Sequence, residues 1–598
     1  MPFSADWTRM DRRCALATLA SGVAGAATGL GAFLGAPHRA KGQSATASTP
    51  SAVAAGKRWA VATVHPLATR AAQNAFARGG NAFDAAIAAA FMLGVVDGHN
   101  SGIGGGCFIL ARTAAGEFIA IDGRETAPAQ AHRDMFLRNG QPDPQASRIG
   151  PLASGVPGQV AALARASLAY GRGGWSAALR EAAEVATEGY LIGNRTAAAI
   201  RRQALQLRQF PGSAAQFLAA DGSPPAVGQR LRQPDLGRTL AALADEGPDW
   251  FYRGPFARTC ADWMSRNGGM LTAADFATYT AVTRAPLKTA YRDWQVIGFP
   301  PPSSGGIHVA QMLLMLERFP VAALLRDEPA TAVHLLAEVM KRAFADRAHW
   351  LGDSDFVGVP KGLIDRSYCQ ELAASIDLNR ATEVRAHGQP PAADTELFTR
   401  QHTTHLTAAD AAGNWVAITN TINTTFGSCV VIPGTGVVMN NEMDDFSIAP
   451  GIPNAFGLIG AEANAIAPGK RPLSSMSPTI VADALGNPRL TCGAAGGPRI
   501  ISAVLQCLLR VLDQGLAVDA ALDAPRVHHQ WSPDQLLLER SWYQADSDAS
   551  AAVTALTQRG HRLADPASIA VAQALELTAD GQLRAASDPR VEGAAAAL

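Results

Sequence analysis

Residues 403–427 read TTHLTAADAAGNWVAITNTINTTFG, and this stretch decides the fold prediction. Its pattern predicts two strands, over 404–409 and 414–423, joined by a turn at residues 410–413. Side chains alternate between the two faces of a strand, so the second strand has one polar and one apolar face. The polar face carries Ala417, Thr419, Thr421 and Asn423, and the apolar face carries Val416, Ile418 and Ile422. The polar face is either solvated or the floor of a site.

Short motifs accompany this stretch along the chain, over about residues 58–590. They are Asn100-Ser-Gly-Ile-Gly-Gly-Gly, Gly123-Arg-Glu-Thr-Ala-Pro, Pro300-Pro-Pro-Ser-Ser-Gly-Gly, Ala345-Asp-Arg, Asn440-Asn-Glu-Met-Asp-Asp-Phe, Arg471-Pro-Leu-Ser-Ser-Met-Ser-Pro-Thr, Gly496-Gly497, Ala524-Pro-Arg-Val-His-His-Gln-Trp and Ala586-Ser-Asp-Pro-Arg. In content and order, these motifs and residues 403–427 closely resemble γ-glutamyltranspeptidases, which are N-terminal-nucleophile hydrolases. The resemblance implies an α+β fold, a four-layer αββα sandwich of the N-terminal-nucleophile hydrolase type.

Thr403 is the candidate nucleophile, and this role rests on the resemblance. Read alone, Thr403 is an ordinary residue at a strand edge. A threonine hydroxyl needs a base, and a free α-amine with a pKa of about 7.7–8.0 can serve once the chain is cut before Thr403. In the family the hydroxyl attacks the preceding carbonyl, here that of His402, and the ester then hydrolyses. The resemblance therefore implies a large subunit over 48–402 and a small subunit over 403–598, which form a heterodimer.

Two further catalytic roles follow from the resemblance. It implies that Thr421 bonds the nucleophile and helps to activate it. It also implies that Gly496 and Gly497 hold the developing oxyanion with backbone N–H groups, just before an apolar helix pattern at 500–512. The alternatives are a cross-strand hydrogen bond for Thr421 and a tight turn without chemistry for the glycine pair.

Recognition of a γ-glutamyl group needs donors for its α-carboxylate and acceptors for its α-ammonium. The residues that match the family's binding positions are Arg124, Ser474 and Ser475 for the carboxylate, and Asn423, Glu442 and Asp445 for the ammonium. Arginine can bind a carboxylate through two parallel hydrogen bonds, and an acid suits a cation. The alternatives are surface ion pairs for Arg124 and Asp445, turn hydrogen bonds for the serines and cross-strand hydrogen bonding for Asn423.

Two loops flank the predicted site. Residues 379–402 are polar and contain two adjacent prolines, which predicts an exposed, mobile segment that can leave the site after cleavage. Residues 448–460 match the lid loop of many bacterial members, with Phe456 where tyrosine is common. This phenylalanine can cover the site by packing, but it has no hydroxyl to donate. Asp97-Gly98 and Cys107 also depart from the family pattern, and we expect them to alter packing rather than chemistry.

Composition and spacing exclude several other classes of function. The 51 basic and 51 acidic residues balance, which argues against a nucleic-acid-binding protein. The glycine run 102–106 follows a predicted helix rather than a strand, which disfavours a dinucleotide or phosphate loop. The seven cysteines form no Cys-x-x-Cys pair, so we expect free, buried thiols. His528 and His529 would point to opposite faces of a strand, which disfavours a shared metal ion. The predicted mechanism needs no metal or organic cofactor.

The N-terminus has the features of an export signal. Arg12-Arg13 precedes a small-residue apolar run over 14–36, which resembles a twin-arginine signal, and 45–47 is one possible cleavage site. We therefore expect residues 1–47 to hold the signal and the start of a linker, and the mature protein to be periplasmic or secreted. The alternative is a membrane anchor, but the Ala/Gly content of the run makes a stable span unexpected.

The leading hypothesis is an exported γ-glutamyltranspeptidase and glutathione hydrolase. It would transfer γ-glutamyl groups from glutathione or other γ-glutamyl compounds to water, amino acids or peptides. A glutaryl or cephalosporin acylase on the same scaffold is the alternative. A glutaryl chain lacks the α-ammonium, so Glu442 and Asp445 favour the glutamyl reading. A third hypothesis is an uncut binding protein. It predicts one intact chain whose function is not changed by Thr403→Ala.

Overall fold

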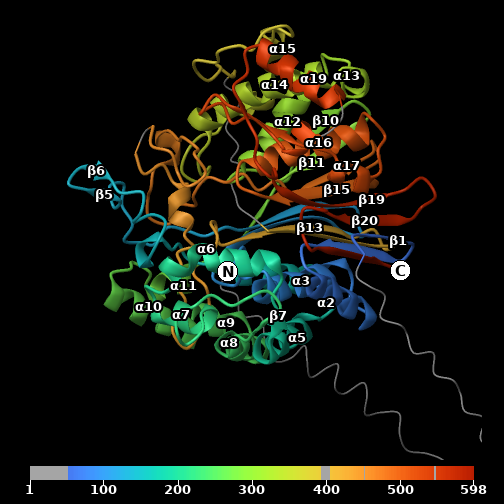
Figure 1. Cartoon of the computed structure of the whole chain (residues 1–598). Helices are drawn as coiled ribbons and strands as arrows, with labels where there is room; N and C mark the ends of the chain where they lie inside the picture. Colours follow the sequence, from blue (N-terminus) through green and yellow to red (C-terminus); the bar gives the residue numbers. More distant parts are fainter. Residues whose placement is uncertain (1–50, 392–403, 450, 545–546) are drawn as a thin grey trace, which may run out of the picture.

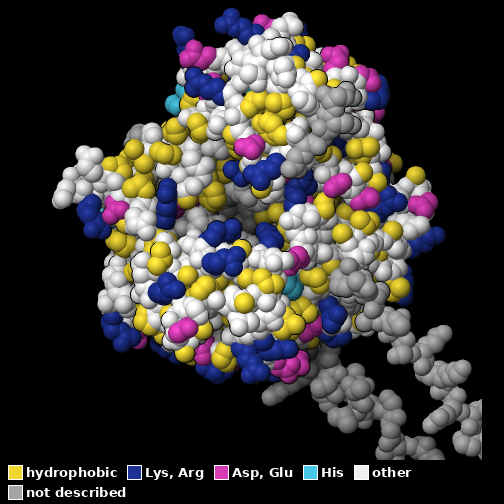
Figure 2. All heavy atoms as spheres, in the orientation of Figure 1, with side chains coloured by type: hydrophobic (Ala, Val, Ile, Leu, Met, Phe, Trp, Pro, Cys, Tyr) yellow, Lys and Arg dark blue, Asp and Glu magenta, His cyan; other side chains and the backbone are white. Residues whose placement is uncertain are grey.

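The computed structural model describes residues 51–391, 404–449, 451–544 and 547–598. Figure 1 shows four layers, in which two stacked sheets lie between two layers of helices. The predicted four-layer αββα sandwich is confirmed. Figure 2 shows the same face of the molecule as spheres, with a hollow near its centre. The predicted export segment 1–47, the His402–Thr403 bond and Thr403 itself lie outside the described residues.

Each central sheet has seven strands, and its neighbouring strands run antiparallel. The first sheet has the order β21 (Ala594–Ala597), β2 (Trp59–Thr63), β12 (Thr404–Asp410), β13 (Trp415–Thr421), β3 (Gly106–Arg112), β4 (Phe118–Gly123) and β9 (Val282–Arg284). The second has the order β1 (Val53–Gly56), β20 (Leu583–Ser587), β19 (Val571–Leu577), β15 (Pro488–Ala495), β14 (Thr479–Ala482), β11 (Trp294–Gly298) and β10 (Leu287–Tyr291). Between the sheets, the rings of Phe108 and Phe299 stack with centroids 4.0 Å apart.

The predicted hairpin forms the centre of the first sheet. Strands β12 and β13 pair from Thr404 opposite Asn420 to Ala409 opposite Trp415. The apolar face of β13 packs into the helix-covered core, while the other face turns toward the second sheet and is buried. There the Nδ1 of His405 and the Oγ1 of Thr419 lie 3.0 Å apart, and the imidazole fills the space over Gly493. The polar face is therefore not solvated.

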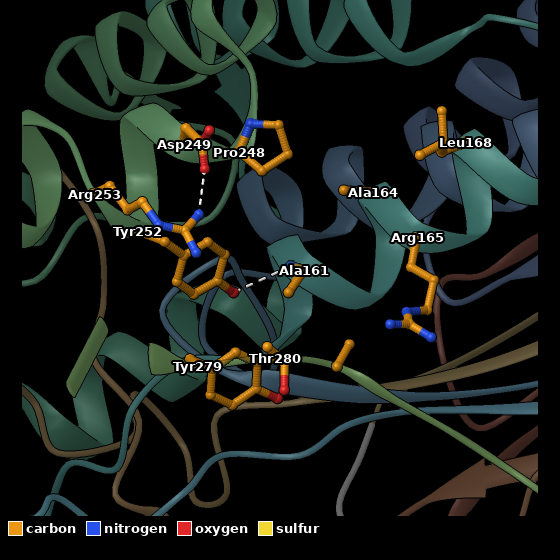
Figure 3. A pocket seen from close by; sticks show the side chains of 11 residues that line it. Ala161, Ala164, Arg165, Leu168, Pro248, Asp249, Tyr252, Arg253, Tyr279 and Thr280 are labelled. Atoms are coloured by element: carbon orange, nitrogen blue, oxygen red, sulfur yellow. Dashed lines mark hydrogen bonds and ion pairs between the residues drawn. The ribbon is translucent and has the colours of Figure 1, made fainter. Parts of the chain in front are cut away.

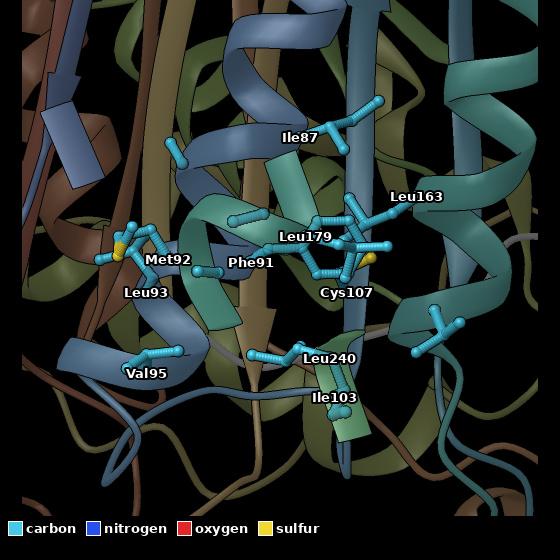
Figure 4. Packing of buried hydrophobic residues seen from close by; sticks show 14 of the residues in the cluster. Ile87, Phe91, Met92, Leu93, Val95, Ile103, Cys107, Leu163, Leu179 and Leu240 are labelled. Carbon is cyan, nitrogen blue, oxygen red and sulfur yellow. The ribbon is translucent and has the colours of Figure 1, made fainter. Parts of the chain in front are cut away.

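Helix α3 (Ala82–Val96) is apolar on nearly all sides because it is covered on nearly all sides. It packs on β12 and β13 and against α2 (Pro66–Ala77), α4 (Gln159–Tyr170) and α5 (Trp175–Glu188). Figure 4 shows Ile87, Phe91 and Leu93 among side chains from the neighbouring helices. The sequence predicts this helix over 84–96. The structure starts it at Ala82, because the Asn81 side chain accepts from the amides of Phe83 and Asp84.

Helices α12 (Ser304–Leu316) and α16 (Arg499–Leu512) cover the second sheet, and α14 (Pro329–Trp350) packs against α12. The sequence predicts a rigid loop over 300–306, and that prediction is wrong for its last three residues. Ser303 caps α12 by accepting from the amide of Gly305 at 2.9 Å, so the helix begins at Ser304.

The remaining elements surround this sandwich. On the side of the first sheet, the predicted helical region 155–290 also contains α6 (Asn194–Leu207), α7 (Pro211–Phe217), α8 (Pro234–Glu246), α9 (Pro248–Tyr252), α10 (Pro255–Asn267) and α11 (Ala273–Thr278). The other described helices are α13 (Val321–Asp327), α15 (Arg366–Ala374), α17 (Val518–Asp523), α18 (Ser541–Gln544) and α19 (Ser547–Gln558). Small sheets pair β5 (Leu137–Arg138) with β6 (Gln141–Pro142), β7 (Tyr190–Leu191) with β8 (Arg230–Leu231), and β16 (Val527–His528) with β17 (Leu536–Leu538) and β18 (Leu563–Ala564).

Across the described ranges, no single helix is both long and apolar enough to cross a membrane. Helices α12 and α13 meet that length and composition together, but they bend by 84° at the break between them. Every residue of α12 is buried, so its apolar character serves the core of the second helical layer.

Candidate active site

The N-terminal end of β12 marks the place where the predicted nucleophile belongs. Thr403 lies outside the described residues, and Thr404 is the first described residue of the strand. The Thr404 hydroxyl donates to the Asp97 carboxylate at 3.2 Å. Asp97 departs from the family pattern, and the structure places it in contact with the residue that follows Thr403.

Thr421 and Asn423 lie at the end of the hairpin that also holds Thr404. Thr421 is buried as the last residue of β13, and its Oγ1 accepts from the Asn423 amide at 2.7 Å. The sequence predicts a strand through Asn423, but Asn423 has a φ of 73°, so the ladder stops at Thr421. The Asn423 Nδ2 donates to the Asn441 carbonyl, while its Oδ1 is buried and has no partner among the described residues. That oxygen is an acceptor of the kind an ammonium group requires.

The glycine run 102–106 supports this end of β13 by close packing. A Cβ on Gly105 would overlap the Thr421 carbonyl oxygen, and one on Gly104 would overlap the Val438 carbonyl oxygen. Gly102 differs, because a Cβ there would lie 3.8 Å from the nearest atom, the Gly94 carbonyl oxygen. The run therefore lets the backbone approach β13, which explains its composition without a phosphate site.

Gly105→Ala should reduce the free energy of unfolding by about 1–3 kcal/mol, because the added methyl group overpacks against Thr421. Gly102→Ala is the matched control in the same run, and its effect should stay within about 0.5 kcal/mol. Chemical denaturation of the two variants beside the parent protein gives the comparison. Equal effects of the two substitutions would contradict the packing role of Gly105.

Arg124 is the centre of a buried cluster of charges. Its Nη1 pairs with Glu442 and lies 3.5 Å from the Glu125 carboxylate, and its Nη2 lies 2.8 Å from the Asp445 carboxylate. The structure thus brings together three predicted binding residues and adds Glu125, which sequence reasoning missed. The signal for Glu125 is its position inside the Gly123-Arg-Glu motif. Tyr279 contacts the main chain of this cluster, since its hydroxyl donates to the Arg124 carbonyl at 2.6 Å.

The charges in this cluster do not balance. Arg124 offers one positive charge to the carboxyl groups of Glu125, Glu442 and Asp445, and all four side chains are buried. Arg347 adds a second positive charge near Asp445, so two cations face three carboxyl groups. Burial raises the pKa of Glu125 to about 7 and raises the pKa of Glu442 well above its usual range, against the opposing effect of Arg124. A cation bound beside these carboxyls would favour their ionised forms. The cluster is therefore suited to an ammonium group.

The predicted serines lie next to an arginine that sequence reasoning missed. Arg347 Nη2 donates to Ser475 Oγ at 3.3 Å, and its Nε donates to Ser304 Oγ at 3.0 Å. Ser474 Oγ accepts from the Met476 amide at 3.1 Å. Burial lowers the pKa of Arg347 to about 10, which still leaves it charged at neutral pH. The signal for Arg347 is the Ala345-Asp-Arg motif.

Gly496 and Gly497 open onto a pocket of about 460 Å³. They have φ values of 138° and 61°, which favour glycine, and α16 follows at Arg499. The pocket is also lined by Asn423 and by Phe456 of the predicted lid loop. A Cβ on Gly497 would lie 2.7 Å from the Phe456 ring, so this ring lies over the glycine pair. Phe456 thus packs against the predicted oxyanion-binding glycine pair, and its role as a cover for the site stays a prediction.

A second, smaller cavity holds the other end of the predicted site. Asp445 and Arg347 line it together with Asn454, the residue two positions before Phe456. Residues 454–456 therefore separate an Asp445 side from a glycine-pair side. Arg124, Glu442, Ser474 and Ser475 are buried and line neither of these two spaces.

Another pocket lies between α4 and α9, away from these residues (Figure 3). Its Tyr252 hydroxyl accepts from the Ala161 amide at 3.1 Å, and Arg253 pairs with Asp249. It is lined by none of the predicted site residues. Its link to the site is indirect, through Tyr279, which lines the pocket and bonds Arg124.

The histidines and cysteines have structural surroundings. His528 Nδ1 lies 2.7 Å from Ser502 Oγ, whereas His529 Nε2 lies 3.1 Å from Asp534, so the two rings have separate partners. Six of the seven cysteines fall in the described ranges, and these six are free and buried as expected.

His334, Glu338 and His561 lie close enough together to hold a metal ion. However, Glu338 is already paired with two cations, Lys341 at 2.8 Å and Arg342 at 2.9 Å. The two histidine rings are joined by a contact of 2.7 Å between Nδ1 and Nε2. The cluster therefore forms a hydrogen-bonded ion-pair network.

Comparison with known proteins identifies the family of this chain. The sequence model of the family described as Gamma-glutamyltranspeptidase matches residues 68–598. The chain belongs to the gamma-glutamyltranspeptidase family. One relative is the glutathione hydrolase proenzyme of Escherichia coli, 40% identical over 89% of this chain and 90% of that protein. Members of the family are enzymes with a threonine N-terminal nucleophile.

The gamma-glutamyltranspeptidase family also relates the chain to acylases. The Acylase ACY 1 proenzyme of a Pseudomonas species is 36% identical over 91% of this chain and 94% of that protein. The crystal structure of cephalosporin acylase from Bacillus halodurans superposes with a TM-score of 0.80 at 28% identity, over 91% of this chain and 97% of that chain. The choice of acyl group therefore depends on the residues of the site.

Proposed function

We propose that this chain is a γ-glutamyltranspeptidase and glutathione hydrolase, which moves γ-glutamyl groups from amides such as glutathione to water, amino acids or peptides. The buried cluster of three carboxyls around Arg124 is the observation that carries the proposal. A γ-glutamyl group brings an α-ammonium that would balance the acidic excess, whereas a glutaryl group has none. The same argument ranks this function above a glutaryl or cephalosporin acylase. Similarity to glutathione hydrolases supports it.

The proposed reaction runs through an ester on Thr403. The α-amine of Thr403 takes the hydroxyl proton while Oγ bonds the γ-carbonyl carbon, and the amides of Gly496 and Gly497 stabilise the oxyanion. The C–N bond then breaks, and the leaving amine takes that proton. Water or an acceptor amine attacks the ester, gives up a proton through the same α-amine, and releases Thr403 with its hydroxyl restored. The Thr403 hydroxyl, its α-amine and the two glycine amides are the catalytic groups of these steps.

Maturation and location are part of the same proposal. The chain would cut itself before Thr403, giving a large subunit over 48–402 and a small subunit over 403–598. Relatives named as proenzymes support this processing. The pattern of residues 1–47 supports export to the periplasm or beyond.

Paired initial rates on a γ-glutamyl anilide and the matching glutaryl anilide test the acyl preference. The γ-glutamyl substrate should react at least about tenfold faster, since one charge-assisted contact to the ammonium is worth roughly that factor. Glycylglycine should increase the γ-glutamyl rate by acting as an acceptor. Asp445→Asn should lower the γ-glutamyl rate and leave the glutaryl rate nearly unchanged. Faster turnover of the glutaryl substrate would overturn the proposal in favour of an acylase.

A further inference from the structure

Among the residues that the structure describes, the pocket beside the glycine pair has only arginines as charged lining residues. Arg195 from α6 and Arg499 from α16 line it, together with neutral residues such as Asn100, Gln203 and Ser568. No aspartate or glutamate of the described ranges lines it. Figure 2 shows Lys and Arg side chains at the rim of the hollow that lies above α6 on this face. The space is therefore electropositive.

Within the described ranges, neither arginine has an ion pair or a hydrogen bond of its side chain. Glu592 reaches the same end of α6, but it bonds Asn194 at 3.3 Å rather than Arg195. Burial lowers the pKa of Arg499 below its ordinary value, with no carboxylate acting against this effect. Both arginines also lie in the first turn of their helices, where the helix dipole disfavours a cation. An anion in the pocket would satisfy both side chains.

The position of the pocket indicates which part of a substrate enters it. Asp445, which is expected to bind the α-ammonium of a γ-glutamyl group, lines the other cavity, and of the predicted ammonium-binding residues only Asn423 borders this pocket. With the acyl carbon at Gly496 and Gly497, the pocket takes what lies beyond the scissile bond. A volume of about 460 Å³ is large enough for a dipeptide, whose two extended residues span about 7 Å.

We propose that Arg195 and Arg499 form a carboxylate subsite for the leaving group of the donor and for the acceptor. The enzyme would then prefer leaving groups and acceptors that are peptides with a free C-terminal carboxylate over their neutral amides. Donor and acceptor share the subsite because the acceptor amine attacks from the side on which the leaving amine departed. This inference rests on the proposed function.

The donor side is tested with glutathione and with glutathione whose glycine carboxyl is a primary amide. The parent enzyme should hydrolyse glutathione with a kcat/KM about tenfold higher than that for the amide. Arg195→Gln should remove most of this preference by raising KM for glutathione, and Arg195→Lys should retain part of it. Arg201→Gln is the matched control, because Arg201 is exposed on the same helix and does not line the pocket. It should keep the parent's preference.

A binding measurement separates this inference from the proposed function. Calorimetry with glycylglycine and glycylglycine amide needs no turnover. Glycylglycine should bind more tightly than its amide, and Arg195→Gln and Arg499→Gln should each reduce the affinity for glycylglycine several-fold. Hydrolysis of γ-glutamyl anilide without a carboxylate preference would overturn the subsite and leave the proposed function standing. Carboxylate binding without any γ-glutamyl turnover would support the subsite and overturn the proposed function. Equal binding of the two dipeptides would refute the subsite whatever the enzyme's activity.

Discussion

Thr403→Ala is expected to leave the chain in one piece and to abolish turnover of γ-glutamyl amides. The same hydroxyl would open the His402–Thr403 bond and carry the acyl group, so one substitution removes both steps. Loss of a nucleophile from a catalytic unit typically costs a factor of about 10³ or more in rate. Intact mass would show one chain in place of two, and anilide hydrolysis would report the loss of activity.

Two variants control this experiment. Thr403→Ser keeps a hydroxyl and should still be cut and active. Thr404→Ala removes the neighbouring hydroxyl, which bonds Asp97 at 3.2 Å, and should still be cut. Processing or near-normal turnover in Thr403→Ala would exclude Thr403 as the nucleophile and favour the reading of the chain as an uncut binding protein.

Arg124→Met is expected to lower the free energy of unfolding by about 3–5 kcal/mol, because it leaves buried carboxyl groups without their cation. Denaturation in the Thr403→Ala background, where one chain unfolds, gives the measurement. Arg133→Met is the control, since Arg133 pairs at the surface with Glu462 at 3.0 Å. Such exposed pairs contribute about 1 kcal/mol or less.

A second substitution distinguishes lost pairing from lost packing. Adding Glu442→Gln to Arg124→Met removes one of the stranded carboxyls and should recover part of the stability. If Arg124→Met costs no more than Arg133→Met, the charge cluster does not contribute as described.

The elements that follow from local pattern were predictable from the sequence. The hairpin at 404–421 and helix α3 have the alternation and apolar content that their surroundings require. Their ends depend on single residues that the pattern does not reveal. Asn423 ends its strand through a left-handed φ, and Ser303 starts α12 through a cap.

The site divides in a similar way. The motifs nominate Arg124, Glu442 and Asp445, but their mutual pairing joins residues more than 300 positions apart. Local periodicity contains no information on such contacts. Glu125 and Arg347 belong to two of the sequence motifs. Their place in the site follows from their burial beside other charged groups, which only the folded chain reveals. Likewise, the need for glycine at position 105 becomes clear only in the folded chain, where the Thr421 carbonyl oxygen leaves no room for a Cβ.

The order of the strands has a consequence for a chain cut before Thr403. In the first sheet β12 and β13 lie between β2 and β3, and in the second sheet β14 and β20 pair with β11 and β1. The two pieces would therefore be interleaved within both sheets rather than docked across an interface. To exchange partners between molecules, they would have to break main-chain ladders in each sheet. Maturation would thus create two new chain ends, but the two subunits could separate only if the protein unfolded.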